Sequence, residues 1–342
     1  MMARMNTIAP PDPSVLAAAR SLSDAQAKPT GALGRLEELA AWVAACQGVC
    51  PPRPLADVRV VVFAGDHEVA ASGVSAYPAE VTPAMVHGIL AGGAGVNALA
   101  RAVGASVAVY DLGVRQLDGV PAEVQRFRVG PARAIQREDA LTERELETAL
   151  DAGDTIAAEA IAEGAELLIA GDLGIGNTTP AAALLAASLD LRGADVAGRG
   201  TGIDDATLAT KIALIDAALD RVGDRAADPM QRLAALGSAD IAAAVGFISG
   251  AVRRGVPVLV DGLIASVEAL IADELHPGAR AWMVAGHRST EPGCELAQTH
   301  LGLDPILDLQ MRLGEGSGAV LAVGVLHGAI AALREVTLLA DL

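Results

Sequence analysis

The chain has 342 residues, of which 52% are hydrophobic and 20% charged, and this apolar content excludes an intrinsically disordered chain. Its 25 Lys and Arg against 42 Asp and Glu give a formal net charge of −17, which excludes nucleic acid and anionic membranes as expected partners because both would be repelled. An anionic small molecule would therefore need a local site built from backbone N–H groups or a few basic side chains.

The first 50 residues are predicted to be helical. Residues 1–13 contain no apolar run of the roughly 7 to 15 residues that a secretory signal needs, so we expect none. Apolar residues then recur at helical spacing over residues 14–22 and 33–46. A proline cluster ends this pattern and marks a candidate domain boundary: Pro51, Pro52 and Pro54.

From residue 58 onward, short apolar runs alternate with helical segments. Runs typical of strands buried on both faces occupy residues 58–64, 106–110, 167–170, 256–260 and 281–284. Helical patterns occupy a segment opened by the capping box of Thr142 and Glu145, and residues 96–103, 155–163, 206–222 and 240–253. The apolar stretch 318–333 is shorter than the roughly 20 residues of a membrane span and is expected to be a buried helix. This alternation predicts an open, doubly wound α/β sheet that binds its ligand at the carboxyl ends of the strands.

Four predicted strands end in glycine beside a polar or charged residue. Glycine allows the backbone to approach a ligand closely, and Asp, His and Ser side chains can then fix it. We therefore expect the site at this edge. The four ends are Gly65-Asp66-His67, Gly171-Asp172, Asp261-Gly262 and Gly286-His287-Arg288-Ser289.

The glycine-rich segment 171–180 is the strongest local motif. Its glycines lie between an apolar strand and a helix, so free backbone N–H groups can form a nest for phosphate, with donors from Asn177, Thr178 and Thr179. The alternative is a tight strand-to-helix turn capped by threonine. A Walker loop is excluded because no Lys follows the last glycine, and the glycine spacing departs from the dinucleotide fingerprint.

Glu315 stands between Gly314 and Gly316, which leave the backbone free to present its carboxylate in a cleft. A carboxylate so placed is a candidate general base, and the alternative is a solvent-exposed loop glutamate. His67 and His287 could suggest a metal pair, but each lies at a separate strand end without an i, i+3 or i+4 partner of ligand type, so we expect no metal. Three cysteines without disulfide or zinc spacing are typical of a reducing cytosol, so we expect a cytoplasmic protein: Cys46, Cys50 and Cys294.

Five motifs stand out along the chain, at residues 28–37, 65–67, 73–78, 174–180 and 311–318. Taken together, these motifs resemble those of the nicotinate-nucleotide–dimethylbenzimidazole phosphoribosyltransferases of cobalamin lower-ligand assembly, in the order and spacing of that family. The resemblance runs from about residue 14 to residue 340.

The resemblance implies a reaction, a fold and an assembly. The 5-phosphoribosyl group of nicotinate mononucleotide would pass to 5,6-dimethylbenzimidazole with inversion at the anomeric carbon, giving α-ribazole 5′-phosphate and nicotinate. No cofactor is expected, because nicotinate leaves from a ring nitrogen that already carries positive charge. The implied fold is a Rossmann-like parallel sheet with flanking helices over residues 55–290, plus a small helical domain from both chain ends, 1–54 and 291–342, in a homodimer.

The resemblance also implies roles for individual residues. Glu315 would be the general base and Asp172 a supporting catalytic carboxylate. The 5′-phosphate and nucleotide would be held by Gly174, Ile175, Gly176, Asn177, Thr178, Lys211 and Gly314, and the base by Tyr77, Met85 and Leu313.

Three of these positions depart from the family pattern. Asp172 replaces a glutamate, and Tyr77 and Met85 stand where some relatives have serine and glutamine. These departures leave the preferred base open more than the reaction. A non-catalytic mononucleotide or benzimidazole binding protein is the main alternative, disfavoured by the presence of Glu315, and a dinucleotide-dependent oxidoreductase is disfavoured by the glycine spacing.

Overall fold

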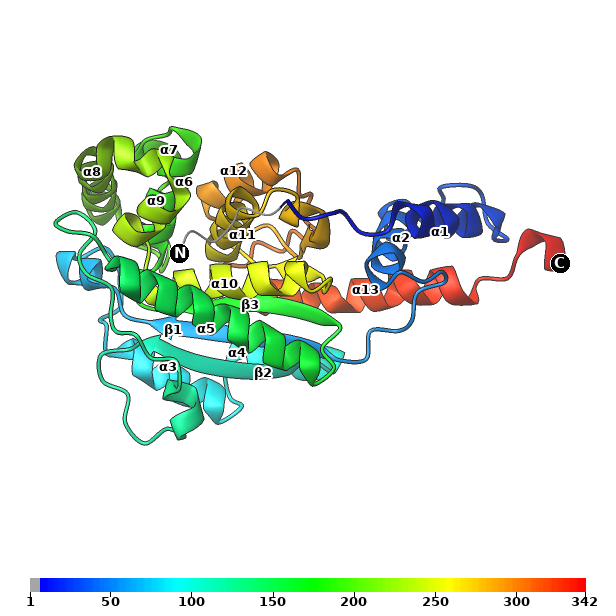
Figure 1. The fold of residues 1–342 in the computed structure, drawn as a ribbon, viewed down its shortest axis with the longest axis horizontal. Helices are drawn as coiled ribbons and strands as arrows, with labels where there is room; N and C mark the ends of the chain where they lie inside the picture. The colour runs from blue at the N-terminus through cyan, green and yellow to red at the C-terminus, as the bar shows by residue number, and fades with distance from the viewer. Residues whose placement is uncertain (1–6) are drawn as a thin grey trace.

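Five parallel strands form the central sheet in the order β2-β1-β3-β4-β5. Figure 1 labels three of them, β1, β2 and β3. The computed structural model describes residues 7–342, so the first six residues of the predicted 1–13 and 1–54 segments lie outside the described residues. This strand order is that of doubly wound folds whose ligand site lies where the order reverses, here between β1 and β3. The predicted α/β class is confirmed, and so is each strand: β1 Val58–Gly65, β2 Ser106–Gly113, β3 Leu167–Leu173, β4 Val258–Val260 and β5 Met283–Ala285.

The helices alternate with the strands as expected. Two predicted helical segments form a single helix, and several helices that were not predicted are present. The predicted segments at 142 and 155–163 are one helix, α5, and its capping box is present: Glu145 N donates to Thr142 Oγ1 at 3.2 Å.

The predictions missed α11 because it is buried along most of its surface and so lacks the one-sided apolar pattern of an exposed helix. The α-helices are α1 Pro13–Ala25, α2 Arg35–Gln47, α3 Val81–Leu90, α4 Gly95–Val103, α5 Glu143–Ala162, α6 Thr178–Leu189, α7 Gly193–Val196, α8 Asp205–Val222, α9 Pro229–Leu236, α10 Ala239–Arg253, α11 Leu263–Leu275, α12 Pro292–Leu301 and α13 Ser317–Glu335. Short 3₁₀ helices are η1 Glu68–Ser72, η2 Ala122–Gln125, η3 Gly223–Ala227, η4 Ala279–Trp282 and η5 Leu339–Asp341.

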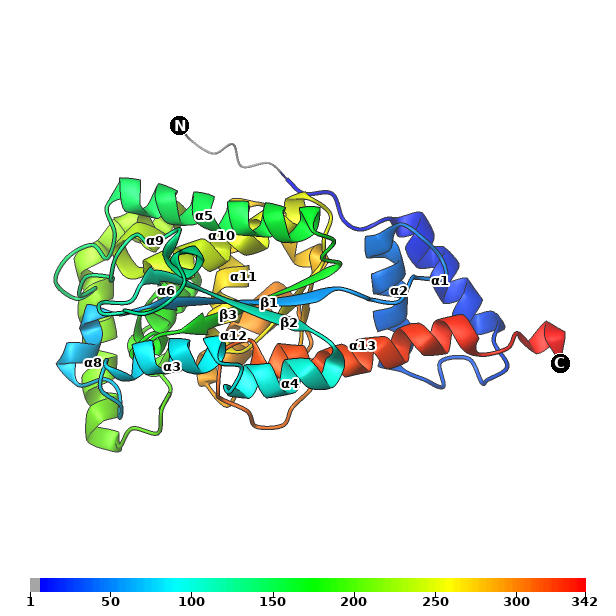
Figure 2. The ribbon, with the colours of Figure 1, turned by 90° about the horizontal axis from the view of Figure 1, so that it is seen from below.

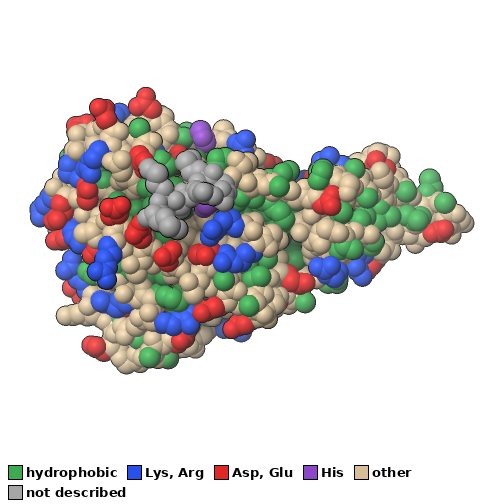
Figure 3. All heavy atoms as spheres, viewed as in Figure 1, with side chains coloured by type: hydrophobic (Ala, Val, Ile, Leu, Met, Phe, Trp, Pro, Cys, Tyr) green, Lys and Arg blue, Asp and Glu red, His purple; other side chains and the backbone are tan. Residues whose placement is uncertain are grey.

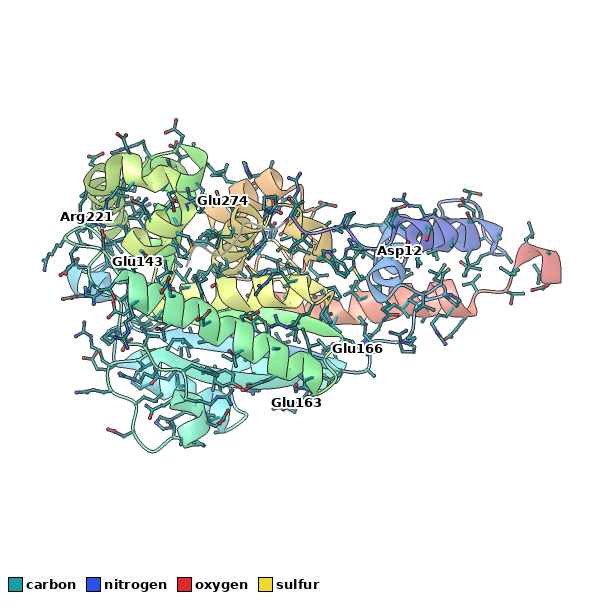
Figure 4. All side chains as sticks on the ribbon, in the orientation of Figure 1. Asp12, Glu143, Glu163, Glu166, Arg221 and Glu274 are labelled. Atoms are coloured by element: carbon teal, nitrogen blue, oxygen red, sulfur yellow. The ribbon has the colours of Figure 1, made fainter. Side chains whose placement is uncertain are left out.

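Helices cover both faces of the sheet. Alternate β1 residues serve two cores: Phe63 packs in one with α5 and α10, and Val62 in the other with α4 and α13. Figure 2 shows α5 and α10 on one side of the sheet and α3, α4 and α13 on the other. At the carboxyl-terminal end of α5, Glu166 accepts a hydrogen bond from Ala56 N at 2.6 Å, which ties this end of the helix to the entry of β1 (Figure 4).

The two chain ends pack together: α1 and α2 pack against α13, and these helices form an arm that extends from the sheet (Figure 1). Gln26 Nε2 donates to Ala332 O at 2.9 Å and Leu333 O at 3.0 Å, which joins α1 to α13. The arm shares one apolar core with the adjacent sheet face, and α12, from the 291–342 segment, packs on α11 instead. The expected meeting of the chain ends is therefore present, while the division at residues 54 and 290 stays a prediction.

Helix α13 links the arm to the site. It is long and apolar enough to cross a membrane by length and composition, but more than half of it is buried inside the protein, as predicted for 318–333. On the molecular face in Figure 3, acidic and basic side chains intermix over the α/β body, and hydrophobic side chains are frequent on the arm.

Candidate functional site

A cavity of about 470 Å³ opens at the carboxyl edge of the sheet beside the start of α6. Two arginines and one carboxylate give it polar walls, and its basic residues supply the local positive charge that an anionic ligand of this acidic protein requires. The lining residues are Ala197, Gly198, Arg199, Gly200, Gly202, Leu208, Thr290, Glu291, Pro292 and Arg312.

Glu315 lies in the turn that precedes α13, against the end of β3. It is only 2% exposed, so the alternative of a solvent-exposed loop glutamate is wrong. Its N–H donates to Asp172 O at 3.3 Å, and its Oε2 accepts from Val96 N at 3.4 Å. Burial raises the pKa of Glu315. The hydrogen bond from Val96 N–H acts to lower this pKa, and the negative charge of Asp261 acts to raise it further. A buried carboxylate with a raised pKa is suited to accept a proton near neutral pH.

The glycines around Glu315 are explained by the backbone geometry. Gly314, Glu315 and Gly316 have φ values of 81°, 63° and 80°, so the turn is left-handed throughout. A left-handed residue other than glycine costs about 1–2 kcal/mol, which the surrounding contacts must offset. Gly171 of β3 leaves room for this turn, because a Cβ there would lie 2.5 Å from the Glu315 carbonyl.

Asp172 supports this arrangement through its backbone, while its side chain faces a separate cluster. Its Oδ1 accepts from Asn177 Nδ2 at 2.5 Å. Burial, with the neighbouring charges of Asp240 and Glu268, raises the pKa of Asp172 well above its usual range. Burial acts to raise the pKa of Asp240, but His67, 3.3 Å away, and the hydrogen bonds of Ser238 and Asp172 together outweigh burial and lower this pKa. Asp172 therefore holds the proton of this carboxyl pair, and Asp240 holds the charge.

Lys211 reaches from α8 to the start of α6. Its buried Nζ donates to Thr178 Oγ1 at 2.8 Å and to Gly198 O at 3.0 Å. Burial lowers the pKa of Lys211 to about 8, with Glu291 acting in the opposite direction. The ammonium group and the positive end of α6 thus meet beside the cavity, a combination suited to phosphate.

The glycine-rich segment forms part of this corner, but several of its donors are already engaged. Ile175 N donates to Thr82 Oγ1 at 3.2 Å and Asn177 N to Gly174 O at 3.2 Å. Within the described chain, α6 begins at Thr178 without a side-chain cap, so the threonine-capped turn considered above is not observed. The segment leads into α6, whose start lies beside the cavity. Because some of its amides already donate within the protein, fewer are free to bind phosphate than in a complete backbone nest.

The three predicted base-binding residues come from separate elements around this edge. Tyr77 is 55% exposed and follows Ala76, whose N–H donates to Thr201 Oγ1 at 3.0 Å. Met85 is half-buried on α3. Leu313 is 53% exposed and lies against Gly95, directly before the Val96 amide that holds Glu315. None of the three is among the residues that line the cavity, but exposed large apolar side chains such as Tyr77 and Leu313 suit contact with a flat aromatic ligand.

The two histidines singled out in the sequence lie at different strand ends and pair with different carboxylates. His67 faces Asp240 at 3.3 Å, and His287 faces Asp261 at 3.2 Å. Among residues 7–342, no group of three or more His, Cys, Asp or Glu side chains is placed to hold a metal ion.

Sequence reasoning did not assign a role to two residues that shape the site. Arg312 lines the cavity and donates from Nη1 to Gly200 O at 2.8 Å, and its place in the 311–318 motif was the available signal. Asp240 lies in α10, far along the chain from Asp172, and no sequence signal indicated their contact.

Comparison with known proteins adds independent findings. A family model described as phosphoribosyltransferase matches residues 8–341. The nicotinate-nucleotide–dimethylbenzimidazole phosphoribosyltransferase of Mycobacterium avium (strain 104) is 52% identical over 342 residues, covering 98% of this chain and 96% of that protein. The protein of the same name from Mycobacterium tuberculosis (strain ATCC 25618 / H37Rv) is 52% identical over 329 residues, covering 96% and 91%. The crystal structure of CobT from Thermus thermophilus has a TM-score of 0.91 at 43% identity and covers 94% of this chain and 96% of that one.

Proposed function

The chain belongs to the nicotinate-nucleotide–dimethylbenzimidazole phosphoribosyltransferase family, and we propose that it transfers the 5-phosphoribosyl group of nicotinate mononucleotide to 5,6-dimethylbenzimidazole. The products are α-ribazole 5′-phosphate and nicotinate, in the assembly of the cobalamin lower ligand. The observation that carries this proposal is the buried Glu315, which lies three residues after Arg312 in the segment that contributes Arg312 to the wall of the cavity. The resemblance seen in the sequence is confirmed at the level of the family.

Glu315 is proposed as the general base. One benzimidazole nitrogen attacks the anomeric carbon while the carbon–nitrogen bond to nicotinate breaks and its electron pair returns to the pyridine ring. The other benzimidazole nitrogen becomes acidic as the new bond forms, and Glu315 takes its proton. A fixed carboxylate stabilises charge that develops only in the transition state, which is the interaction that accelerates a reaction. Asp172 is proposed to support the base through its backbone carbonyl, which accepts a hydrogen bond from the Glu315 N–H.

The 5′-phosphate is proposed to bind at the start of α6. Lys211 and the α6 N-terminus supply positive charge there, and the 174–178 segment leads into α6. Gly314 is proposed to contact the nucleotide, as the family resemblance implies. Arg312 bounds the same cavity. Tyr77, Met85 and Leu313 are proposed to contact the flat base, as the family resemblance implies. Leu313 supports this because it lies against Gly95, next to the Val96 amide that contacts Glu315.

The protein is further proposed to act as a homodimer in the cytoplasm. The support for the compartment is that Cys46, Cys50 and Cys294 are free thiols, as expected in a reducing environment. The homodimer rests on the family resemblance.

The proposal is tested by incubating the protein with nicotinate mononucleotide and a panel of benzimidazoles, phenols and adenine, then separating and identifying the products. We expect nicotinate and an α-linked ribotide of at least one benzimidazole. Binding of both substrates without release of nicotinate would instead indicate the non-catalytic binding protein.

A further inference from the structure

Asp261, at the end of β4, holds the turn that carries Glu315. It is 3% exposed, and its two carboxylate oxygens accept from one backbone amide of that turn and one of the first turn of α13: Oδ2 from Gly316 N at 3.2 Å and Oδ1 from Ala319 N at 2.8 Å. Asp261 thus satisfies N–H groups at the start of α13 that the helix itself leaves unpaired. One side chain from a neighbouring strand therefore fixes the residue directly after Glu315.

His287, at the end of β5, contacts the carboxylate of Asp261. Its Nε2 lies 3.2 Å from Asp261 Oδ1, and both side chains are buried. The imidazole ring also lies directly against Gly318 of α13, where a Cβ atom would overlap the ring. The His287 backbone is itself held, since Gln298 Nε2 donates to its carbonyl at 2.9 Å.

We propose that Asp261 and His287 are positioning residues that keep Glu315 in its left-handed turn, with its carboxylate directed at the reacting base. The proposal rests on the proposed function of Glu315. A glutamate disfavours the left-handed conformation, so the turn needs outside support, and the amide contacts of Asp261 provide it. Asp261 is 3% exposed and its carboxylate is directed at the Gly316 and Ala319 amides and at His287, so its contacts are those of a positioning residue.

The electrostatic consequence distinguishes this role from a purely structural one. The titratable groups that face this pair are Glu315 on the turn, Glu268 on α11, Cys294 on α12 and Asp308, and the charge of Asp261 raises the pKa of Glu315. Loss of that charge lowers this pKa. Loosening of the turn exposes Glu315 and lowers it further. The acid limb of the pH–rate profile therefore moves to lower pH.

The test uses three variants of the full chain and one matched control. Asp261→Asn keeps the shape of the side chain but can accept a hydrogen bond from only one of the two backbone amides. His287→Phe keeps a ring against Gly318 and removes the donor, whereas His287→Gln keeps an N–H that can reach Asp261. The control is Asp273→Asn on α11, because Asp273 also accepts two backbone amides, Gly278 N at 3.2 Å and Arg280 N at 3.0 Å.

We expect Asp261→Asn and His287→Phe to lower kcat by on the order of 10-fold to 100-fold, the scale of a misplaced catalytic group, with little change in KM for nicotinate mononucleotide. In Asp261→Asn the acid limb should also move to lower pH. His287→Gln should recover most of the kcat lost in His287→Phe, and Asp273→Asn should match the wild type. If Asp261→Asn fails to fold in a thermal melt, the comparison of His287→Phe with His287→Gln decides the question.

The positioning role is overturned if both Asp261→Asn and His287→Phe retain the wild-type kcat and acid limb, or if their losses appear in KM alone. An inactive wild-type protein would refute the proposed function, and this proposal with it. Active wild-type and Asp273→Asn proteins beside unaffected Asp261→Asn and His287→Phe proteins would refute only the positioning role.

Discussion

The Oε2 atom of Glu315 lies 3.4 Å from the backbone nitrogen of Val96, so the first turn of α4 holds the carboxylate that we propose as the base. The positive end of a helix favours a carboxylate, while burial disfavours its charge. Here burial prevails, and the pKa of Glu315 is raised. The contact therefore orients the base without making it a weak proton acceptor.

The pH dependence of turnover should reflect this balance. Below the raised pKa of Glu315 its carboxyl group is protonated and cannot accept the benzimidazole proton, so kcat should fall as pH decreases through that value. We expect the acid limb of the kcat profile to lie above the usual range for a glutamate. A flat profile down to pH values at which ordinary glutamates are protonated would show that another group is the base.

Lys211 should contribute mainly to binding of the nucleotide. Lys211→Ala is expected to weaken nicotinate mononucleotide binding by roughly 1.5–3 kcal/mol, the range for a charge-assisted contact, and to leave benzimidazole binding almost unchanged. Lys28, the other lysine of the chain, lies in the arm and pairs with Glu37, so Lys28→Ala is the matched control. Isothermal titration calorimetry measures both ligands, and equal losses for both would make Lys211 a structural residue.

The lowered pKa of Lys211, about 8, gives a second prediction for the nucleotide site. Only the protonated lysine attracts phosphate, and this form is the majority below that pKa and the minority above it. The affinity of the free enzyme for nicotinate mononucleotide should therefore fall as pH rises through about 8, and this fall should be lost in Lys211→Ala. A fall of the same size in the variant would assign it to another group.

Tyr77 tests the base pocket. If the ring covers the base, each added methyl carbon should increase affinity by about 0.8 kcal/mol through burial, so dimethylbenzimidazole should outcompete benzimidazole. Because Tyr77 is 55% exposed, its removal should leave the fold intact, and Tyr77→Ala should erase most of that preference. Competition for transfer measures it, and an unchanged preference would place the base elsewhere in the cleft.

The strands were predictable because each is a short apolar run followed closely by glycine or aspartate, a pattern that depends only on neighbouring residues. The burial of Glu315 was not, since it depends on Gly171, Val96 and Asp261, which are distant in the sequence. Its two flanking glycines indicated a special backbone but left its exposure open. The pairing of Asp261 with His287 likewise follows from the adjacency of β4 and β5, which only the folded sheet establishes.

The most direct test of the account compares Glu315→Gln with the wild type in transfer from nicotinate mononucleotide to dimethylbenzimidazole. Glutamine keeps the size of the side chain but cannot accept the proton, so we expect kcat to fall by on the order of 10² or more while nucleotide binding is retained. Glu143→Gln, an exposed glutamate in the first turn of α5, is the control and should behave as the wild type. Turnover of Glu315→Gln near the wild-type rate would contradict the assignment of Glu315 as the general base.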